Sequence, residues 1–514
     1  MNKDNVFDNL SQEDLASIVQ VIEDSARKAN ARILSRNLHP NDLSEAGAAE
    51  SFSKLYSEKL HWTKALGWMC WDGRQWIQSD EKAKAAMITY SNDLLTDAKN
   101  EMAESIRQSE TGDPSKEAKE YLRFAQRMRN SKPIENILSL VKAYLAMDTA
   151  VFDANPFDLN TPSGIVDLRT GQIRGHDPLA YCSKMTACAP SAKGLQLFES
   201  FLDTITGSND EIKRYLQLSA GSYTIGKIFH EGIQIAIGGG RNGKSTYYNL
   251  LAAVLGDYSG SIDVNVLTTD RISKGAAKAT LRGKRLVTCG ELEEGQRLST
   301  QTLKQLASTD MLTIEEKYRQ PETITPSHHL VMFSNHLPRV GSTDDGTWRR
   351  IQLVPFSTTI EKKTDKPNYA DYLFQNAGGA VLQWVITGAM DFIKNGCRLE
   401  PPEAVRKATD KYRDQENWLQ NFFDECCMVK KTEAENTPSI FIGVGALYDA
   451  YKEYADRTGT YRRSMPDFNR AMETAGFIKR TVSGGYKHWQ GIDLKNRLYM
   501  NPQGEQLKVE HDAL

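Results

Sequence analysis

The chain has 514 residues, of which 40 % are hydrophobic and 25 % are charged. At roughly 150 residues per domain this length predicts about three domains, each large enough for its own hydrophobic core. The composition excludes a largely disordered chain and a chain built from membrane spans. Lysine and arginine number 64 against 66 aspartates and glutamates, a formal net charge of −2, so any contact with nucleic acid must be local.

Cysteine use and the N-terminal segment indicate a reduced, cytoplasmic protein. The seven cysteines are scattered, with no Cys-x-x-Cys pair and no Cys/His cluster at zinc spacing. The first residues, MNKDNVFDNLSQED, are polar and acidic, and no apolar run reaches the length of a membrane span. We therefore expect neither secretion nor a membrane partner.

The N-terminal region, residues 1–190, is predicted to be mostly helical, with small β-hairpins and an accessory or oligomerisation role. Ser11 caps an expected helix at the start, and helical spacing covers the chain from Asp80 to Ala150. Residues 62–77 hold four of the eight tryptophans around an Asp-Gly pair, which indicates a hairpin that is either a small aromatic core or a stacking platform for nucleic acid. Residues 152–178, rich in Pro, Gly, Asn and Asp, predict further short hairpins.

Changes in pattern divide the rest of the chain. Apolar, strand-like runs alternate with helices over residues 191–365, which indicates an α/β core, and residues 366–430 return to helical spacing as its C-terminal part. Residues 437–497 follow the order helix, helix, hairpin of a winged-helix-like domain, and residues 498–514 form a polar tail. The fold class is therefore a multidomain α/β protein.

A phosphate-binding loop is the strongest motif in the chain. The sequence GGGRNGKST follows the apolar run IQIAI and precedes YYNLLAAVL, so it lies between an expected strand and an expected helix. In a G-x-x-x-x-G-K-S loop, backbone N–H groups hold phosphates, the lysine neutralises β/γ-phosphate charge and the serine hydroxyl coordinates Mg²⁺. The predicted ATP and Mg²⁺ site comprises Gly238, Gly239, Gly240, Arg241, Asn242, Gly243, Lys244, Ser245 and Thr246.

Polar residues at the ends of two later strands extend this site. The strand RLVTCG delivers Glu291, the first choice for the Mg²⁺ shell and for orienting the attacking water, with Glu293 as the second choice. The strand LVMFS ends in Asn335, whose amide could polarise the γ-phosphate or the attacking water, although turns also favour asparagine.

Arg349 and Arg350 stand just before a further strand, IQLVPF. Paired arginines at such a position can form a simple surface pair. In a ring ATPase they instead reach the γ-phosphate of the neighbouring subunit as an arginine finger, and we favour the finger.

The order of these motifs resembles the superfamily 3 helicases, specifically the phage, plasmid and poxvirus-type primase-helicases. The resemblance rests on FDANPFDLNTPSGIVDLRTG, GGGRNGKST, LVTCGELEEG, LKQLASTDMLTIEEKYRQPETITPSHHLVMFSNHLPRV and DDGTWRRI. It implies an AAA+-like P-loop helicase core that binds ATP and Mg²⁺ through Lys244 and Ser245. It also implies an acidic motif, a sensor and a finger, carried by Glu291 with Glu293, by Asn335, and by Arg349 with Arg350.

The same resemblance implies a homo-oligomeric ring, expected to be a hexamer, that moves 3′ to 5′ on single-stranded DNA in a bacterial host cell. Gly290 stands where related rings often carry an acidic residue, so the roles of Glu291 and Glu293 stay open. Many relatives carry a primase upstream, whereas the helical region that normally follows it begins near residue 50 here. We therefore expect priming to come from a separate primase or polymerase partner.

The family also places a β-hairpin ahead of the sensor strand, pointing into the ring channel. Residues 312–325 alternate apolar and polar side chains across a Gln-Pro turn, which predicts a hairpin independently. Lys317 and Arg319 near its tip would grip DNA phosphates, and Tyr318 offers a stacking face. A charged surface hairpin without DNA contact is the alternative.

The expected function is that of an ATP-dependent replicative DNA helicase of a phage, plasmid or other mobile element, acting on replication-fork DNA. A P-loop ATPase that acts as a replication initiator or loader, without processive unwinding, shares the same loop and stays open. A nucleotide kinase is disfavoured because no acceptor pocket or lid is evident. Basic residues of the C-terminal module suit contact with either DNA or protein: Arg462, Arg463, Lys479, Arg480 and Lys487, together with Tyr486.

Overall fold

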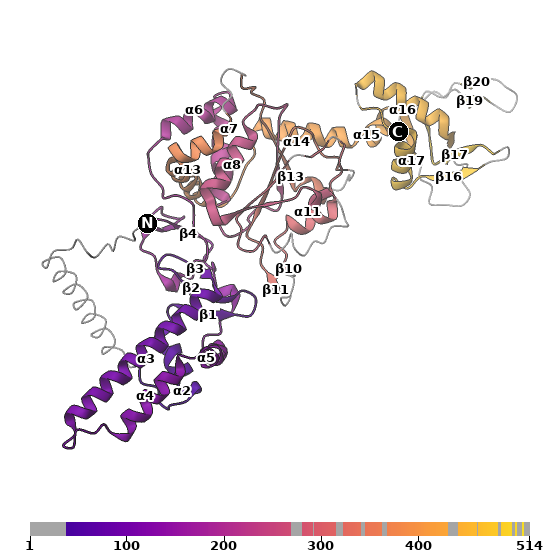
Figure 1. Cartoon of the computed structure of the whole chain (residues 1–514). Helices are drawn as coiled ribbons and strands as arrows, with labels where there is room; N and C mark the ends of the chain where they lie inside the picture. The colour runs from indigo at the N-terminus through magenta and orange to yellow at the C-terminus, as the bar shows by residue number, and fades with distance from the viewer. Residues whose placement is uncertain are drawn as a thin grey trace, which may run out of the picture.

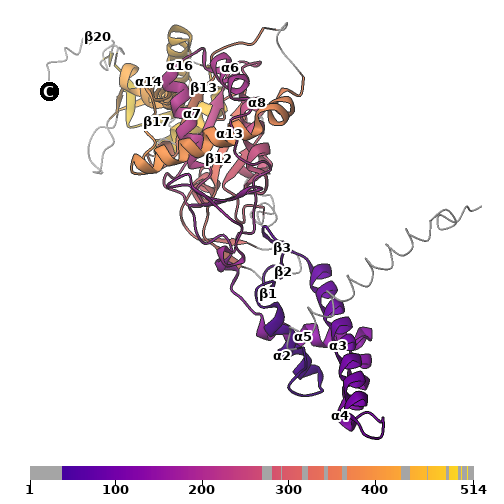
Figure 2. The same ribbon diagram turned by 90° about the vertical axis from the view of Figure 1, so that its left-hand side faces the viewer.

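The computed structural model describes residues 38–268, 280–290, 292–293, 295–314, 322–340, 345–361, 367–429, 440–459, 461–481 and 485–495, with two short strands beyond them. The expected helix at Ser11 lies outside these residues. Figure 1 shows three parts in chain order, which are a helical arm, a central α/β body and a C-terminal module. In both views the arm projects from one end of the body (Figures 1 and 2).

The arm is helical from its first described element onward. Its helices are α2 (Glu45–Tyr56), α3 (Asp80–Gln108), α4 (Lys116–Met128) and α5 (Ser131–Tyr144). Ser44, Ser79 and Ser115 cap three of them, each hydroxyl accepting a hydrogen bond of 3.1 Å from the backbone N–H three residues later. The helical spacing predicted after Asp80 is confirmed.

A three-stranded antiparallel sheet joins the arm to the body. It consists of β1 (Leu60–Thr63), β2 (Gly67–Trp71) and β3 (Trp76–Gln78). The turn before β3 closes where predicted, because Asp72 accepts hydrogen bonds of 2.8 Å from two backbone N–H groups. Trp76 is buried against the rings of Phe152 and Tyr181, and its indole N–H donates to the Pro178 carbonyl over 2.9 Å. Of the two interpretations of this tryptophan-rich segment, the structure therefore favours the aromatic core.

A second small sheet follows, with strands β4 (Asp158–Thr161), β5 (Gly164–Asp167) and β6 (Ile173–Arg174) between the short 3₁₀ turns η1 (Thr149–Val151) and η2 (Pro178–Ala180). The short hairpins predicted here are present. Leu159, Val166 and Leu168 are buried in the same hydrophobic cluster as the helices of the body. The core of the body thus extends across the domain boundary predicted near residue 190, because so small a sheet cannot bury an apolar face by itself.

The body is built on a five-stranded, all-parallel sheet in the order β13-β7-β12-β9-β8. These strands are β7 (Ile233–Ile237), β8 (Ser259–Ile262), β9 (Leu286–Cys289), β12 (His329–Ser334) and β13 (Ile351–Pro355). The remaining elements are α6 (Leu195–Thr206), α7 (Asp210–Ser222), α8 (Lys244–Leu255), η3 (Gly256–Tyr258), α9 (Asn265–Thr268), α11 (Thr300–Leu306), β10 (Leu312–Ile314), β11 (Glu322–Ile324), α12 (Asp345–Trp348), α13 (Tyr369–Lys394) and α14 (Glu403–Glu416).

Helices cover both faces of this sheet. Helices α6, α7, α8 and α13 pack on one face, in a cluster that includes Ala236 of β7. Helices α11, α12 and α14 pack on the other face, in a cluster that includes Ile235 of the same strand. Successive side chains of a strand alternate between faces, so a parallel sheet with two helical layers needs the nearly continuous apolar strands seen in the sequence.

The C-terminal module contains α15 (Trp418–Cys426), β14 (Cys427–Val429), β15 (Phe441–Gly443), α16 (Val444–Thr458), α17 (Met465–Thr474), β16 (Ile478–Thr481), β17 (Lys487–Gln490) and β18 (Ile492–Leu494). Strands β19 (Tyr499–Met500) and β20 (Gln506–Leu507) pair beyond it. Helix α15 packs Trp418 and Phe422 against Tyr451 and Phe468 of the module. This helix, which the sequence groups with the core, therefore shares its hydrophobic cluster with the module instead.

Candidate functional site

The loop between β7 and α8, residues 238–243, depends on glycine at its two ends. Gly243 has φ +75°, and a Cβ added there would lie 2.4 Å from Cγ2 of Ile205 on α6. A Cβ at Gly238 would lie 2.5 Å from the carbonyl oxygen of Phe356. Both distances are too short for a real side chain, so the close packing of this loop excludes any larger residue at either position.

The segment after β13 holds the middle of this loop. The side-chain amide of Asn242 donates to the Thr358 carbonyl over 2.6 Å, and the N–H of Ile360 donates to the Arg241 carbonyl over 2.8 Å. Arg241 has φ +50°, a conformation that residues other than glycine seldom adopt. Sequence reasoning missed residues 358–360, because they carry no motif and approach the loop only through the fold.

Lys244 and Asn335 meet at the carboxyl edge of the sheet. The Lys244 side chain is buried, and its Nζ donates to the Gly238 carbonyl over 2.9 Å and to Oδ1 of Asn335 over 3.0 Å. These residues follow β7 and β12, which are adjacent parallel strands, so their ends lie side by side. The structure thus brings together two residues that the sequence predicted to share one site.

The first turn of α8 presents Ser245 and Thr246, both partly exposed, next to Lys244. Gly243 occupies the N-cap position and has no side chain with which to cap the helix. The N–H groups at a helix start have no partner within the helix, and they favour anions together with the helix dipole. This turn therefore offers backbone donors, a hydroxyl and an ammonium group within a few ångströms, a donor set that suits a polyphosphate with its Mg²⁺.

The acidic segment after β9 lies at the same edge. Glu291, the first choice for the acidic residue, falls outside the described residues, whereas Glu293 is described and exposed. The N–H of Leu292 donates to the hydroxyl of Ser334, at the end of β12, over 3.4 Å. Glu293 is thus carried on a segment tied to the strand that delivers Asn335.

Arg349 and Arg350 lie at the opposite, amino edge of the sheet, just before β13. Their environments differ sharply. The Arg350 side chain is 11 % exposed and forms an ion pair of 2.5 Å with Glu231, while the Arg349 side chain is 68 % exposed and approaches the same carboxylate only at 4.0 Å. The structure keeps both arginines away from Lys244 of their own chain and leaves Arg349 as the one that points into solvent.

Glu231, the partner of Arg350, was not singled out from the sequence. Its Oε1 accepts hydrogen bonds from the Thr309 N–H at 3.2 Å, the Thr309 hydroxyl at 3.1 Å and the Ser308 hydroxyl at 3.3 Å. These donors, the backbone N–H first, hold the pKa of Glu231 below its usual value. Glu231 thereby connects the arginine pair to the residues just ahead of β10. The one sequence feature that could have drawn attention to Glu231 is its position just before the strand that leads into the phosphate loop.

Strands β10 and β11 form the base of the predicted hairpin. They pair antiparallel, with Leu312 opposite Ile324 and Ile314 opposite Glu322. The predicted DNA-contacting residues at the tip, Lys317, Tyr318 and Arg319, lie outside the described residues. At the base, Glu322 forms an ion pair of 2.7 Å with Arg282 of the body.

Ion pairs within the C-terminal region engage several of the cations assigned to DNA or protein contact. Lys479 pairs with Glu473 at 3.1 Å, Arg463 with Glu416 at 3.7 Å, and Arg462 with Asp456 at 4.0 Å. Arg480, Lys487 and Tyr486 are exposed on the β16–β17 hairpin. They are the members of that set best placed to meet a partner.

The class of protein follows from the central sheet and the parts that flank it. An all-parallel sheet with helices on both faces, preceded by a helical arm and followed by a smaller module, makes this a mixed α/β multidomain protein. In the described ranges no helix is both long and apolar enough to cross a membrane.

Two family models match separate parts of the chain. Residues 49–207 match the family described as D5 N terminal like, and residues 236–350 match the family of unknown function DUF5906. This combination is typical of primase-helicase proteins and consistent with the superfamily 3 helicase family. The resemblance drawn from the motifs is therefore confirmed.

The relatives are proteins of large DNA viruses. Proteins named as candidate helicases in Acanthamoeba polyphaga mimivirus, Frog virus 3 and Invertebrate iridescent virus 6 are 26 %, 24 % and 23 % identical over 221, 331 and 346 residues. These matches cover 41 %, 60 % and 59 % of this chain. The chain spans only 23 %, 32 % and 35 % of the length of those curated relatives.

Among solved structures, the apo C-terminal region of NrS-1 aligns at 12 % identity with a TM-score of 0.38, over 67 % of this chain and 85 % of that chain. A similarity at this level carries no argument about function.

Proposed function

We propose that the chain is an ATP-dependent DNA helicase that works as a homo-oligomeric ring, expected to be a hexamer, on single-stranded DNA. The observation that carries the proposal is the contact between Lys244 and Asn335 at the carboxyl edge of the sheet. In the proposal, the Lys244 ammonium binds phosphate and the neighbouring Asn335 amide senses the γ-phosphate or orients water, and their contact supports a shared role. Strands β10 and β11, which lead to the basic hairpin, belong to the same body.

ATP and Mg²⁺ are the proposed cofactors. Residues 238–246 would cradle the phosphates through backbone N–H groups, with Lys244 on the β- and γ-phosphates. The Ser245 hydroxyl and Glu291 would hold the Mg²⁺ shell, with Glu293 as the alternative carboxylate. When bound, Mg²⁺ would neutralise charge on the phosphates, and Asn335 would orient the attacking water.

Subunit contacts would complete the site. An exposed Arg349 at the amino edge is suited to reach the ATP of a neighbouring subunit, where an arginine finger stabilises transition-state charge. Arg350, largely covered and paired with Glu231, would position the turn that carries Arg349. Nucleotide state would then change the position of the hairpin with Lys317, Tyr318 and Arg319, which would move a DNA strand at the replication fork.

Strand displacement on a forked substrate tests the proposal directly. Lys244→Ala should abolish ATP turnover and unwinding, because it removes the buried ammonium that contacts Asn335 at the carboxyl edge. Lys119→Ala, at an exposed position on α4, is the matched control and should behave as the unmodified chain. Unwinding that survives in Lys244→Ala would overturn the mechanism. Electron micrographs with ATP and single-stranded DNA would reveal the ring.

A replication initiator or loader is the second candidate. The exposed Arg480, Tyr486 and Lys487 on the β16–β17 hairpin favour it, since they could mark a DNA site while the ATPase only controls assembly. DNA-stimulated ATP turnover without any strand displacement, over a range of fork lengths, would support this candidate over the helicase. The proposal also includes two expectations from the sequence. The protein would serve a phage, a plasmid or another mobile element in a bacterial host cell, and a separate primase or polymerase would be its partner.

A further inference from the structure

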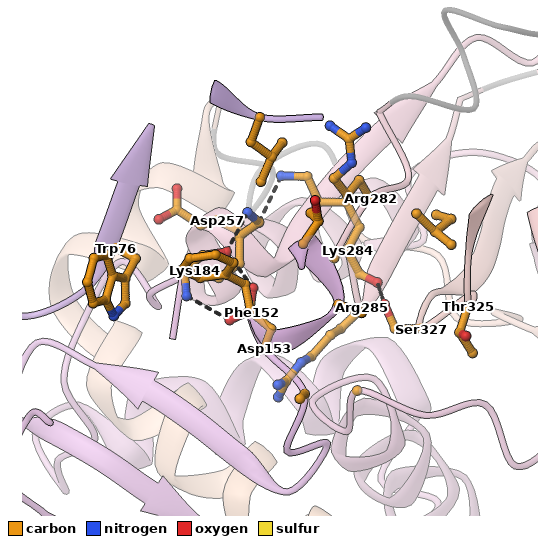
Figure 3. Close-up of a pocket in the computed structure, with 18 of the residues that line it drawn as sticks. Trp76, Phe152, Asp153, Lys184, Asp257, Arg282, Lys284, Arg285, Thr325 and Ser327 are labelled. Atoms are coloured by element: carbon orange, nitrogen blue, oxygen red, sulfur yellow. Dashed lines mark hydrogen bonds between the residues drawn. The ribbon is translucent and has the colours of Figure 1, made fainter. Parts of the chain in front are cut away.

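A large cavity lies where the arm meets the body, at the amino ends of the parallel strands (Figure 3). Its volume is ≈ 980 Å³, against about 300–1,000 Å³ for typical ligand pockets. Its walls come from β3, from the turns around Phe152 and Lys184, from residues 280–285 ahead of β9, and from β11. The phosphate loop is at the opposite, carboxyl edge of the sheet, so this cavity is a separate place in the fold.

Two lysines approach each other across this cavity. Lys184 comes from the segment that follows the β4–β6 sheet, and Lys284 comes from the turn just before β9 (Figure 3). A Cβ built on Gly283 would lie 3.4 Å from Cε of Lys184 and 3.9 Å from its Nζ, so the Lys184 ammonium stands against the turn that carries Lys284. Burial first, and then the charge of Lys184, lower the pKa of Lys284.

Within the described residues, each ammonium group donates to a neutral oxygen rather than to a carboxylate. The Nζ of Lys284 donates to the Asp257 backbone carbonyl over 2.8 Å, and the Nζ of Lys184 donates to the Ser183 hydroxyl over 3.2 Å. In the described part of the chain neither lysine forms an ion pair. Two like charges in a half-buried cavity repel each other, and an anion between them would remove that repulsion.

The acidic residues of the cavity wall are already engaged elsewhere. Asp153 accepts from the N–H of Ser183 over 2.8 Å and from the hydroxyl of the same residue. Asp257 accepts from the Met185 N–H over 3.2 Å, Asp148 accepts from the Ala150 N–H over 2.9 Å, and Glu322 pairs with Arg282. Among the described residues none of these four carboxylates forms an ion pair with Lys184 or Lys284, although the charge of Asp257 raises the pKa of Lys284 and so partly offsets the effect of Lys184. An external anion would supply the closer partner that both ammonium groups lack there.

We propose that Lys184 and Lys284 form a binding site for a phosphate group, carried either by a nucleic-acid strand or by a free phosphate or nucleotide. Lysine ammonium groups are common phosphate ligands, because each offers three donors to oxygens that accept several hydrogen bonds. Residue Glu322 of β11 lines the cavity and sits at the base of the hairpin that leads to Lys317 and Arg319. The inference that the phosphate belongs to a nucleic-acid strand rests on the proposed function. The inference that the two lysines bind a phosphate group does not.

Amine-reactive labelling of the unmodified chain, read by mass spectrometry, tests the site itself. A saturating oligothymidylate should protect Lys184 and Lys284 from the reagent if the phosphate belongs to DNA. Inorganic phosphate or ADP should protect them, and the oligonucleotide should not, if the ligand is free. Exposed Lys99 and Lys119 on the arm serve as internal references. Equal labelling of Lys184 and Lys284 with every ligand, while anisotropy shows the oligonucleotide to be bound, would overturn the proposal.

A double variant gives an independent measurement for the DNA source. Binding of a fluorescein-labelled oligothymidylate by Lys184→Ala/Lys284→Ala should show a salt dependence weaker by about 1.4 in the slope of log K against log salt, from ~0.7 per phosphate contact on a single strand. Lys99→Ala/Lys119→Ala removes the same charge from the arm and should leave the slope unchanged. A slope change equal in both variants would exclude the DNA source. Lys244→Ala separates the two proposals, since it should stop ATP turnover and leave the lysine protection intact.

Discussion

The glycines of the phosphate loop should differ strongly in their tolerance of a single methyl group. At Gly243 the backbone is left-handed, with φ +75°, and an added Cβ would meet Cγ2 of Ile205 at 2.4 Å. A left-handed backbone costs an L-residue about 1–2 kcal/mol, and forcing Ile205 aside adds about 1–3 kcal/mol of overpacking. Gly243→Ala should therefore destabilise the body by about 2–5 kcal/mol.

Two neighbouring glycines separate these contributions. Gly240 has φ +96° and its Cβ would meet no described atom within 4 Å, so Gly240→Ala should cost only the backbone term of about 1–2 kcal/mol. Gly239 has neither a positive φ nor a described neighbour within 4 Å, and Gly239→Ala should change stability little. Thermal unfolding measures the series, at about 2–4 °C per kcal/mol for a domain of 150–250 residues.

A compensating change in Ile205 checks the steric part of this reasoning. Leucine lacks the branch at Cβ, so Gly243→Ala/Ile205→Leu should recover part of the lost stability, while Ile205→Leu alone should cost less than about 1.5 kcal/mol. The reasoning would be refuted by a Gly243→Ala protein that unfolds at the same temperature as Gly239→Ala.

The other predictions concern the arginine pair and two adjacent histidines, His328, which is buried, and His329, which is partly exposed. Arg349→Ala should lower ATP turnover by about 10³-fold or more and leave stability within about 0.5 kcal/mol. Arg350→Ala should instead destabilise by about 1–3 kcal/mol, because it removes the 2.5 Å ion pair to Glu231 and leaves that carboxylate only the 4.0 Å approach of the exposed Arg349. Equal effects of the two substitutions on ATP turnover and on stability would contradict this division. Burial lowers the pKa of His328 to about 4 and of His329 to about 3, so both stay neutral when folded and bind protons on unfolding below about pH 6.5. Stability should be full above pH 6.5 and fall by on the order of 3 kcal/mol per histidine between pH 6.5 and 4. His329→Gln should make the loss of stability between pH 6.5 and 4 smaller, as measured by unfolding at a series of pH values. An unchanged dependence of stability on pH would contradict the argument.

Local chemistry explains why much of the fold could be predicted. Serine caps mark the helix starts in the arm, and the apolar run before the glycine-rich loop marks β7, because both signals act within a few residues. The contact between Lys244 and Asn335 was also within reach, since parallel strands place their carboxyl ends at one edge.

Contacts between distant segments were beyond the sequence. Ile205 lies against Gly243 only because α6 packs beside the start of α8, and Thr358 reaches Asn242 only because β13 pairs with β7. Packing crosses two of the predicted domain limits for the same reason, since α15 and the β4–β5 hairpin bury their apolar faces in neighbouring hydrophobic clusters. Burial depends on what the other segments offer, and no local pattern records it.

The sequence by itself determined the phosphate loop, the order of the strands along the chain and the residues at the strand ends, because each depends on spacing and residue type. Only the tertiary structure decided that Arg350 is held by Glu231 while Arg349 is exposed, and that Lys184 and Lys284 share a cavity. Adjacent arginines look alike in a sequence, and lysines a hundred residues apart look unrelated. Their environments differ or coincide because the packed arm, sheet and helices set the distances between charges, and these distances govern how strongly the charges interact.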